Sequence, residues 1–167
     1  MNTKRETFNR IEQLLNKLEL TIETKDLNRP WGGFFVLDES DTEQFVRQFF
    51  PEEKMEDIKI SEKLSPKILM VAPHKRLSWQ FHKRRAELWR CIEGEVAVAT
   101  SHTDEETDKH VLKVGDKIKL KQGQRHRLIG LDSWGVVAEI WQHTDAGNPS
   151  DEDDIVRLQD DFGRQDQ

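Results

Sequence analysis

The stretch from residue 77 to residue 94, LSWQFHKRRAELWRCIEG, carries three side chains of metal-binding type at a regular spacing. Gln80 and His82 alternate along a predicted strand, so both point to the same side and can aim donor atoms at one point. Glu87 follows after a charged turn, and we expect its carboxylate to return to that point from the next strand. An amide oxygen, an imidazole and a carboxylate together suit a borderline divalent ion such as zinc, manganese, cobalt, nickel or iron.

A second motif lies downstream, with the spacing Gly115-x5-Lys121-x-Gly123-x2-His126. The two glycines mark turns, and His126 opens a further predicted strand. A histidine taken alone is more often a core or surface side chain than a ligand. The spacing of His126 together with the first motif reverses that expectation.

Together the two motifs resemble those of the cupin family, whose metal ion is held by residues from both. By this resemblance Gln80 takes the place of one motif histidine, and His82, Glu87 and His126 match the remaining ligands. The resemblance implies one divalent metal ion, zinc in the first place. It also implies an all-β fold, the double-stranded β-helix or jelly roll.

Three positions depart from the cupin pattern. His74 stands where the first motif has a glycine, Lys121 replaces a proline, and Gly130 replaces an asparagine. Such positions shape turns, so the departures affect loop geometry more than metal binding.

Four blocks in the right order resemble, more narrowly, the C-terminal cupin of the type II, bifunctional mannose-6-phosphate isomerases. They are Arg29-Pro30-Trp31-Gly32, LSWQFHKRRAELW at residues 77–89, His126-Arg127, and EDDIVRLQDDFGR at residues 152–164. In that family, arginines of the first and last blocks are implicated in isomerase activity. The resemblance therefore implies catalytic roles for Arg29, Arg157 and Arg164.

The implied reaction is the metal-dependent interconversion of an aldose phosphate and a ketose phosphate. Mannose 6-phosphate and fructose 6-phosphate are the first pair expected, and a heptose or glucose phosphate is a related substrate. Cationic side chains suit a phosphate, and arginine can give it two charge-assisted hydrogen bonds. We expect Arg85, Lys119 and Arg127 to bind the substrate. The proton-transfer base stays open between His143, Glu139, Lys119 and a metal-bound water.

Two other classes of function compete with an isomerase. The same barrel serves equally as a non-catalytic sugar-binding or regulatory module, and other cupins are iron-dependent oxygenases. The complete ligand set favours an enzyme, and the arginine blocks favour a phosphate ester over an oxygenase substrate.

Composition limits the remaining possibilities. With 167 residues and a net charge of −6, the chain has the size of one domain and is not expected to bind nucleic acid. Cys91 is the only cysteine, which excludes an intrachain disulfide and a thiolate metal cluster. No apolar run is long enough to span a membrane, so we expect a cytoplasmic protein that binds a small anionic molecule and forms a homodimer.

The elements that must position these residues follow from hydrophobic periodicity. Apolar residues at helical spacing predict helices at residues 3–20 and 41–50. The second helix is extra relative to the bifunctional enzymes, and we expect it to cover the site or a partner surface. Short alternating segments predict strands at residues 33–37, 57–62, 67–72, 77–82, 87–92, 95–100, 110–114, 117–120, 125–129 and 135–142.

We expect these elements to form one cupin domain at residues 1–167. It divides into a helical extension with the RPWG block at 1–55, a jelly-roll core at 56–145 and an acidic tail at 146–167. The tail is acidic enough that we expect it to fray in part.

Overall fold

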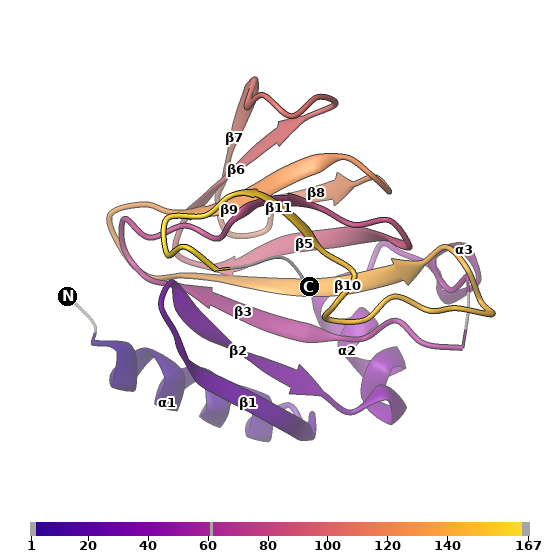
Figure 1. Cartoon of the computed structure of the whole chain (residues 1–167). Coiled ribbons are helices and arrows are strands. Elements are labelled where there is room, and N and C mark those ends of the chain that lie inside the picture. The colour runs from indigo at the N-terminus through magenta and orange to yellow at the C-terminus, as the bar shows by residue number, and fades with distance from the viewer. Residues whose placement is uncertain (1–2, 61, 165–167) are drawn as a thin grey trace.

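The structure is a computed structural model that describes residues 3–60 and 62–164. Its strands form two antiparallel sheets that face each other (Figure 1). One sheet has six strands in the order β1-β2-β3-β10-β5-β8, and the other has five in the order β11-β4-β9-β6-β7. In chain order the strands are β1 (Ile22–Arg29), β2 (Gly32–Leu37), β3 (Lys67–Val71), β4 (Trp79–Phe81), β5 (Arg85–Glu93), β6 (Val96–Ser101), β7 (Asp108–Leu112), β8 (Lys117–Leu120), β9 (Arg125–Gly130), β10 (Gly135–His143) and β11 (Val156–Gln159).

This architecture confirms the predicted jelly roll with an N-terminal helix and a further short helix. Consecutive strands such as β9 and β10 lie in different sheets, so the chain winds around the interior of a barrel. Helix α1 (Lys4–Lys17) begins after Thr3, whose side chain accepts the N–H of Glu6 at 3.1 Å. A short 3-10 turn, η1 (Glu39–Asp41), leads into helix α2 (Thr42–Phe49).

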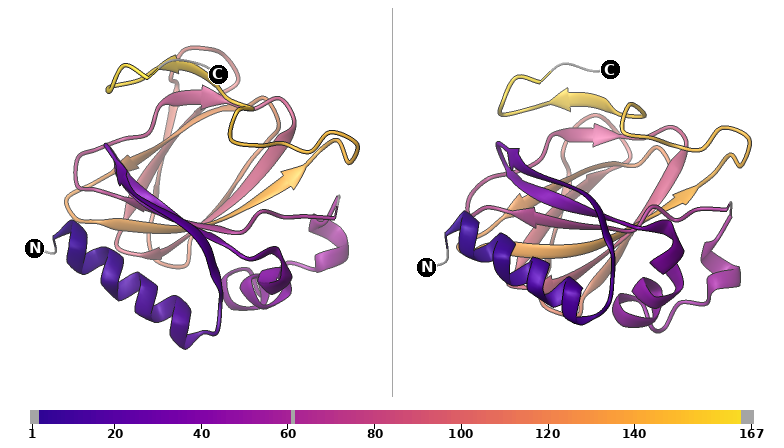
Figure 2. Two further views of the ribbon diagram at one scale, coloured as in Figure 1. Left: turned by 60° about the horizontal axis from the view of Figure 1, so that its bottom comes forward. Right: turned by 90° about the horizontal axis from the view of Figure 1, so that it is seen from below.

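Two apolar cores lie on the two faces of the six-stranded sheet. Ile68 and Met70 of β3 belong to the core outside the barrel, and Leu69 and Val71 to the core inside it, as alternation along a strand requires. Helices α1 and α2 cover the outer face, and Figure 2 shows α1 on the opposite side of the barrel from β11. Helix α2 therefore packs on the outside of the barrel, where it does not cover the site described below.

The barrel interior is apolar at one end and polar at the other. Along β5, Trp89 and Cys91 belong to the inner apolar core, and Glu87 is the next residue to point inward. Along β10 the same change occurs between Val137 and Glu139. Buried charged groups thus gather at one end of a closed sheet, which is where chemistry becomes possible.

Three segments differ from what the sequence predicted. The strand predicted at residues 57–62 is wrong, because helical turn α3 (Met55–Ile58) occupies its start and residues 59, 60 and 62 belong to no strand. Strand β1 was missed, since its sequence IETKDLNR is polar and it is an edge strand held by β2. The acidic tail, expected to fray in part, adds the unpredicted strand β11 to the second sheet within the part of it that the structure describes.

Two of the positions that depart from the cupin pattern have a tight backbone environment: His74 lies in a turn, and Gly130 is the last residue of β9. His74 has a φ of +59°, the left-handed conformation that favours glycine. At Gly130 a Cβ would lie 2.0 Å from the carbonyl oxygen of Ala72, so an asparagine does not fit. Of these two positions only His74 shapes a turn, whereas Gly130 allows β9 to approach the backbone of Ala72.

Among the described residues, no helix has the length and apolar character needed to cross a membrane.

Candidate metal centre and its cavity

His82, Glu87 and His126 bring three buried donor atoms together at the polar end of the barrel. Glu87 Oε1 lies 3.2 Å from His82 Nε2 and 3.1 Å from His126 Nε2. His82 follows β4, Glu87 lies on β5 and His126 lies on β9, so both sheets contribute to the cluster.

Backbone carbonyl groups fix the tautomers of both histidines. His82 Nδ1 donates to the carbonyl oxygen of Asp154 at 2.7 Å, and His126 Nδ1 donates to that of Gln124 at 3.1 Å. With Nδ1 of each ring bonded to a carbonyl oxygen, Nε2 is the ring nitrogen that faces the Glu87 carboxylate.

This cluster of lone pairs fits a divalent cation. Within the described part of the chain, neither Glu87 Oε1 nor His126 Nε2 has a hydrogen-bond partner. Two ligand atoms that are each about 2.0–2.2 Å from one ion lie about 3 Å apart, and the separations here are 3.1 and 3.2 Å. His82, Glu87 and His126 are the residues that would hold the ion, and their nitrogen and oxygen donors suit a borderline metal.

Gln80, the fourth expected ligand, lies beside this cluster. It stands directly opposite His126 in the pairing of β4 with β9, and it lines the cavity next to the cluster. Its Oε1 atom accepts a hydrogen bond from the Ser78 hydroxyl at 2.6 Å. Gln80 is thus on the same side of the sheet as the metal-binding cluster, and its ligation of the ion stays a prediction.

Arg85 places a positive charge beside the three donors. Its Nη2 donates to His82 Nε2 at 3.2 Å, its Nε lies 3.8 Å from Glu87 Oε2, and its guanidinium stacks 3.5 Å from the ring centroid of Trp141. Burial lowers the pKa of His82, and the charge of Arg85 lowers it further. Burial alone would raise the pKa of Glu87, but the charge of Arg85 holds it well below its usual range. Both residues are therefore in the deprotonated forms that bind metals.

A second buried carboxyl group, that of Glu139, faces the same space. Trp89 Nε1 donates to Glu139 Oε2 at 2.6 Å, and Trp141 Nε1 donates to Oε1 at 2.8 Å. Burial raises the pKa of Glu139 well above its usual range, and the nearby charge of Glu87 raises it further. The site thus holds a neutral carboxylic acid beside an ionised carboxylate, two forms suited to different roles.

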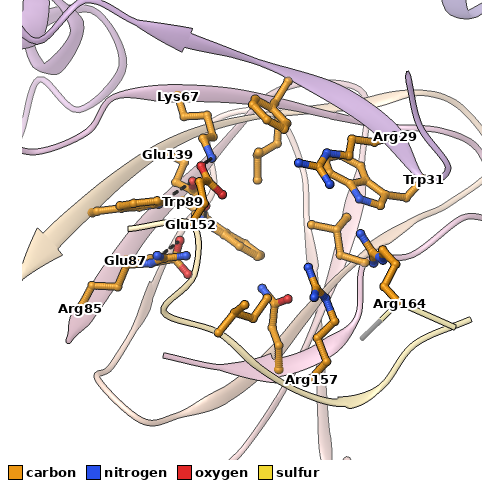
Figure 3. Close-up of a pocket in the computed structure, with 16 residues that line it drawn as sticks. Arg29, Trp31, Lys67, Arg85, Glu87, Trp89, Glu139, Glu152, Arg157 and Arg164 are labelled. Carbon is orange, nitrogen blue, oxygen red and sulfur yellow. Dashed lines mark hydrogen bonds and ion pairs between the residues drawn. The ribbon is translucent and has the colours of Figure 1, made fainter. Parts of the chain in front are cut away.

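A cavity of about 90 Å³ opens next to these groups. Figure 3 shows the guanidinium groups of Arg29, Arg157 and Arg164 gathered on one side of it, while Glu87 and Glu139 lie on another. The three arginines come from β1, from β11 and from the chain after β11. Residues that are far apart in the sequence therefore line one cavity.

The RPWG block brings Arg29 to this place through a two-residue turn between β1 and β2, in which Arg29 pairs with Gly32. A Cβ on Gly32 would lie 1.9 Å from the carbonyl oxygen of Met70, so only glycine allows the hairpin to approach β3 this closely. The Arg29 side chain is oriented by Asp26, whose carboxylate is 3.0 Å from its Nε.

The terminal block brings the other two arginines. Arg157 lies opposite Gln80 in the pairing of β11 with β4. Arg164 is held by the Asp160 carboxylate through two hydrogen bonds of 2.8 Å. Asp160 of the acidic tail thus fixes the guanidinium of Arg164 at the cavity.

Lys67 and Glu152 also line the cavity, and sequence reasoning missed both. Lys67 Nζ donates to Glu152 Oε1 at 2.6 Å and lies 4.4 Å from the ring centroid of Phe34 and 4.9 Å from that of Trp141. The signal for Lys67 was its alternation with Leu69 in the strand KILMV, which points it inward.

Lys119 and Arg127 lie elsewhere, and their expected substrate-binding roles are not supported by these positions. Lys119 is exposed and pairs with Leu88, which belongs to the outer core, so it lies on the outside of β8. Arg127 is buried, but it donates to the carbonyl oxygen of Leu77 at 2.8 Å and to Glu106 Oε1 at 2.6 Å. Arg127 therefore ties β9 to neighbouring segments.

His143, one of the expected bases, is fully buried and engaged on both ring nitrogens. Its Nδ1 accepts the N–H of Ser150 at 2.9 Å, so the proton is on Nε2, which donates to the Ser65 hydroxyl at 2.9 Å. Because its ring is not part of the cavity wall, this contact pattern is that of a structural residue.

Comparison with known protein families gives a match. A family model described as "Mannose-6-phosphate isomerase C-terminal" matches residues 38–160 of this chain. No curated protein sequence matches the chain significantly.

Solved structures with a similar fold include two bacterial proteins. The capsular polysaccharide assembling protein CapF from Staphylococcus aureus is 14% identical, with a TM-score of 0.52, over 83% of this chain and 34% of that chain. A sugar phosphate isomerase of the cupin superfamily from Silicibacter pomeroyi is 14% identical, with a TM-score of 0.42, over 48% of this chain and 51% of that chain. The chain thus spans about a third and about half of these proteins, and at 14% identity the similarity to CapF concerns the fold alone.

Proposed function

Because the chain belongs to the mannose-6-phosphate isomerase C-terminal family, we propose that it is a metal-dependent sugar-phosphate isomerase. Its substrates in this proposal are an aldose phosphate and the corresponding ketose phosphate. Mannose 6-phosphate and fructose 6-phosphate are the first pair to consider, followed by heptose and glucose phosphates. The ion is zinc, held by His82, Glu87 and His126 with Gln80 as the fourth ligand.

One observation carries the proposal, namely that the cavity lined by the arginine cluster is also lined by Gln80 and by Glu87, the carboxylate shared by the three metal-type donors (Figure 3). A sugar phosphate has a doubly charged end and, several carbons away, a carbonyl end. Arg29, Arg157 and Arg164 bind the phosphate through charge-assisted hydrogen bonds. Anchoring the phosphate directs the carbonyl end toward the buried donors and reduces the entropy cost of orientation.

When bound, the divalent ion supplies Lewis-acid stabilisation of the negative charge that develops on the substrate oxygens. Glu139 transfers the proton between the two adjacent carbons. Its position in the cavity wall suits this role, and the indole N–H groups of Trp89 and Trp141 hold its two oxygens in place. These donors favour the carboxylate while burial favours the acid, so both protonation states are accessible.

A non-catalytic sugar-phosphate-binding module is the second candidate. The observation that favours it is the hydrogen bond from Arg85 Nη2 to His82 Nε2, because that bond engages the lone pair that a metal ion needs. In this case the arginines bind the phosphate and no isomerisation follows.

The test is to measure bound metal in the purified chain and then to screen sugar phosphates for aldose-to-ketose conversion. We expect a bound divalent ion and turnover of at least one aldose phosphate. His126→Ala removes an imidazole ligand, and we expect both bound metal and turnover to be lost. Metal binding without turnover of any sugar phosphate would favour the binding module.

Arg157→Ala tests the phosphate site, with Lys119→Ala as the matched control because it also removes one cation but lies outside the barrel. A hydrogen bond to a charged group is worth about 1.5–3 kcal/mol, so we expect Arg157→Ala to raise KM at least tenfold. The Lys119→Ala variant should keep the KM of the wild type. Equal KM values in the two variants would contradict the proposed phosphate site.

A further inference from the structure

The chain between β10 and β11 crosses the turn that carries the first histidine of the metal centre. We call residues 150–155 the closing segment. It lies beside the turn between β4 and β5, because the carboxylate of Asp154 accepts backbone N–H groups of Lys83 and Arg84. After this segment the chain enters β11, which pairs with β4 and carries Arg157.

Each of the three oxygen atoms of Asp154 accepts at least one hydrogen bond. The carboxylate binds the β4–β5 turn, and the backbone carbonyl binds His82. Its side chain is buried, with Oδ1 accepting from the N–H of Lys83 at 2.9 Å and Oδ2 from that of Arg84 at 3.0 Å. Oδ2 also accepts from the Ser150 hydroxyl at 2.6 Å. Its backbone carbonyl accepts from His82 Nδ1 at 2.7 Å. One residue therefore both clamps the turn that follows His82 and orients the His82 ring.

The hydrogen bonds of the Asp154 carboxylate matter because the direction of a backbone carbonyl is set by the conformation of the segment that carries it. In the structure the Asp154 carbonyl faces His82 while the carboxylate of the same residue is bound to the two turn N–H groups. A partner on the far nitrogen of a metal-binding histidine sets the tautomer, the ring orientation and the basicity of the ligand atom. His82 Nε2 is therefore directed at Glu87 Oε1 by a segment that lies some seventy positions later in the chain.

A second set of bonds joins the closing segment to the same centre. Arg85 Nη1 donates to the Ser150 hydroxyl and to the carbonyl oxygen of Asp151, each at 3.0 Å. The N–H of Ser150 donates to His143 on β10. The segment is thus held by groups of β5 and β10 as well as by the β4–β5 turn, all next to the metal-binding cluster.

We propose that Asp154 is a positioning residue that couples docking of the closing segment to metal binding at His82, Glu87 and His126. The ion binds tightly only when the segment is docked, and by thermodynamic reciprocity the bound ion holds the segment in place. Because β11 follows the segment, metal loading also secures Arg157 at the cavity. This inference rests on the metal centre of the proposed function and does not depend on which sugar, if any, is isomerised.

The first test is zinc affinity of the full chain, measured by calorimetry or by competition with a chromophoric chelator. Asp154→Asn keeps the size of the side chain but turns an NH₂ group toward one of the turn N–H groups. Loss of an outer partner of a metal ligand weakens binding about 10- to 100-fold, and we expect a loss in this range. Asp153→Asn is the matched control, since it makes the same chemical change at the adjacent, exposed position. Zinc affinity of Asp154→Asn within twofold of the wild type would overturn the proposal.

The second test is hydrogen exchange of the backbone amides of residues 150–159, with and without zinc. We expect zinc to slow exchange there in the wild type and in Asp153→Asn, and to have little effect in Asp154→Asn. Faster exchange of Asp154→Asn throughout the barrel, including β10, would show general destabilisation and would overturn a specific coupling. Intact coupling in a chain that isomerises no sugar phosphate would contradict the proposed function and leave this inference standing.

Discussion

His82 and His126 present lone pairs to the same carboxylate oxygen because each ring is already bonded to a backbone carbonyl on its other side. Glu87 is kept ionised by the charge of Arg85, whereas burial keeps Glu139 protonated only a short distance away. Two identical side chains thus acquire opposite protonation states from their surroundings. The division suggests one carboxylate for the metal ion and one for the proton.

Glu139→Gln tests that division of roles. The amide cannot exchange a proton, so we expect turnover to fall about 10²- to 10⁴-fold, the usual contribution of a positioned acid or base. Zinc affinity should stay close to that of the wild type, because Glu139 is not among the three clustered donors. Steady-state kinetics and zinc titration together measure both effects.

The control for this variant is Glu105→Gln, which makes the same change at an exposed loop position. One indole N–H loses its carboxylate acceptor in Glu139→Gln, so a drop in melting temperature is expected alongside the loss of activity. Turnover equal to that of Glu105→Gln would exclude Glu139 as the proton-transferring group.

At the scale of elements, the sequence predicted strands wherever apolar and polar residues alternate on a half-buried surface. It failed at β1, because an edge strand is held by its neighbour and needs little hydrophobic pattern of its own. It failed again at residues 57–62, where a few apolar residues in a polar context are compatible with a helical turn. The jelly-roll fold followed from the motif resemblance, since periodicity alone does not fix topology, and the order and pairing of the strands come from the structure.

The candidate site was predictable to the extent that spacing and alternation decide orientation. Gln80, His82 and Glu87 follow from strand periodicity, and the structure brings His82 and Glu87 together with His126. Lys119 could not be placed in this way, because the register of β8 against β5 decides which face it occupies. Glu152 was missed because it lies in an irregular segment with no period to read.

Helix α2 gives a prediction at this scale. Phe45 is fully buried and lies 5.0 Å from Phe49 between ring centroids, in the core outside the barrel. Phe45→Ala should therefore lower the free energy of unfolding by about 3–5 kcal/mol, measured by urea denaturation. Zinc affinity and KM of the folded variant should not change, because the six-stranded sheet separates this core from the metal centre. A change in zinc affinity above about threefold, well beyond what a remote independent site produces, would show that the helix supports the site directly.

On the scale of the whole molecule, the net charge is negative but positively charged side chains gather at the cavity. The chain carries a formal charge of −6, yet its cavity is lined by Arg29, Lys67, Arg85, Arg157 and Arg164. Glu87, Glu139 and Glu152 also line it, so cationic side chains outnumber the carboxyl groups. An excess of positive charge within a low-dielectric wall attracts anions. The asymmetry is what a small anionic substrate requires, and it supports a phosphate ester over a neutral sugar.

His143 lies on β10 and links it to two other parts of the molecule. Its ring accepts a hydrogen bond from Ser150 of the closing segment and bonds the hydroxyl of Ser65, which precedes β3. The Ser65 N–H in turn donates to the carboxylate of Glu39, in the turn that leads into α2. Burial lowers the pKa of His143 to about 4, and the charges of Lys63 and Arg85 contribute to the lowering. The ring is therefore neutral in the folded chain at pH values where an unfolded chain already binds a proton.

The sign of the resulting pH dependence follows from linkage. Above about pH 6.5, the ordinary pKa of histidine, neither state is protonated at His143 and its contribution to stability is complete. Between that value and about pH 4 the unfolded chain binds a proton that the folded chain does not, so stability falls as pH falls, by up to about 1.4 kcal/mol per pH unit. Below pH 4 the loss ends, since both states are protonated. His143→Gln can keep both hydrogen bonds without titrating, so the wild-type advantage in urea-unfolding free energy should shrink from pH 7 to pH 4 in metal-free buffer. Parallel stability curves for the two proteins would show that His143 is not held neutral by the fold.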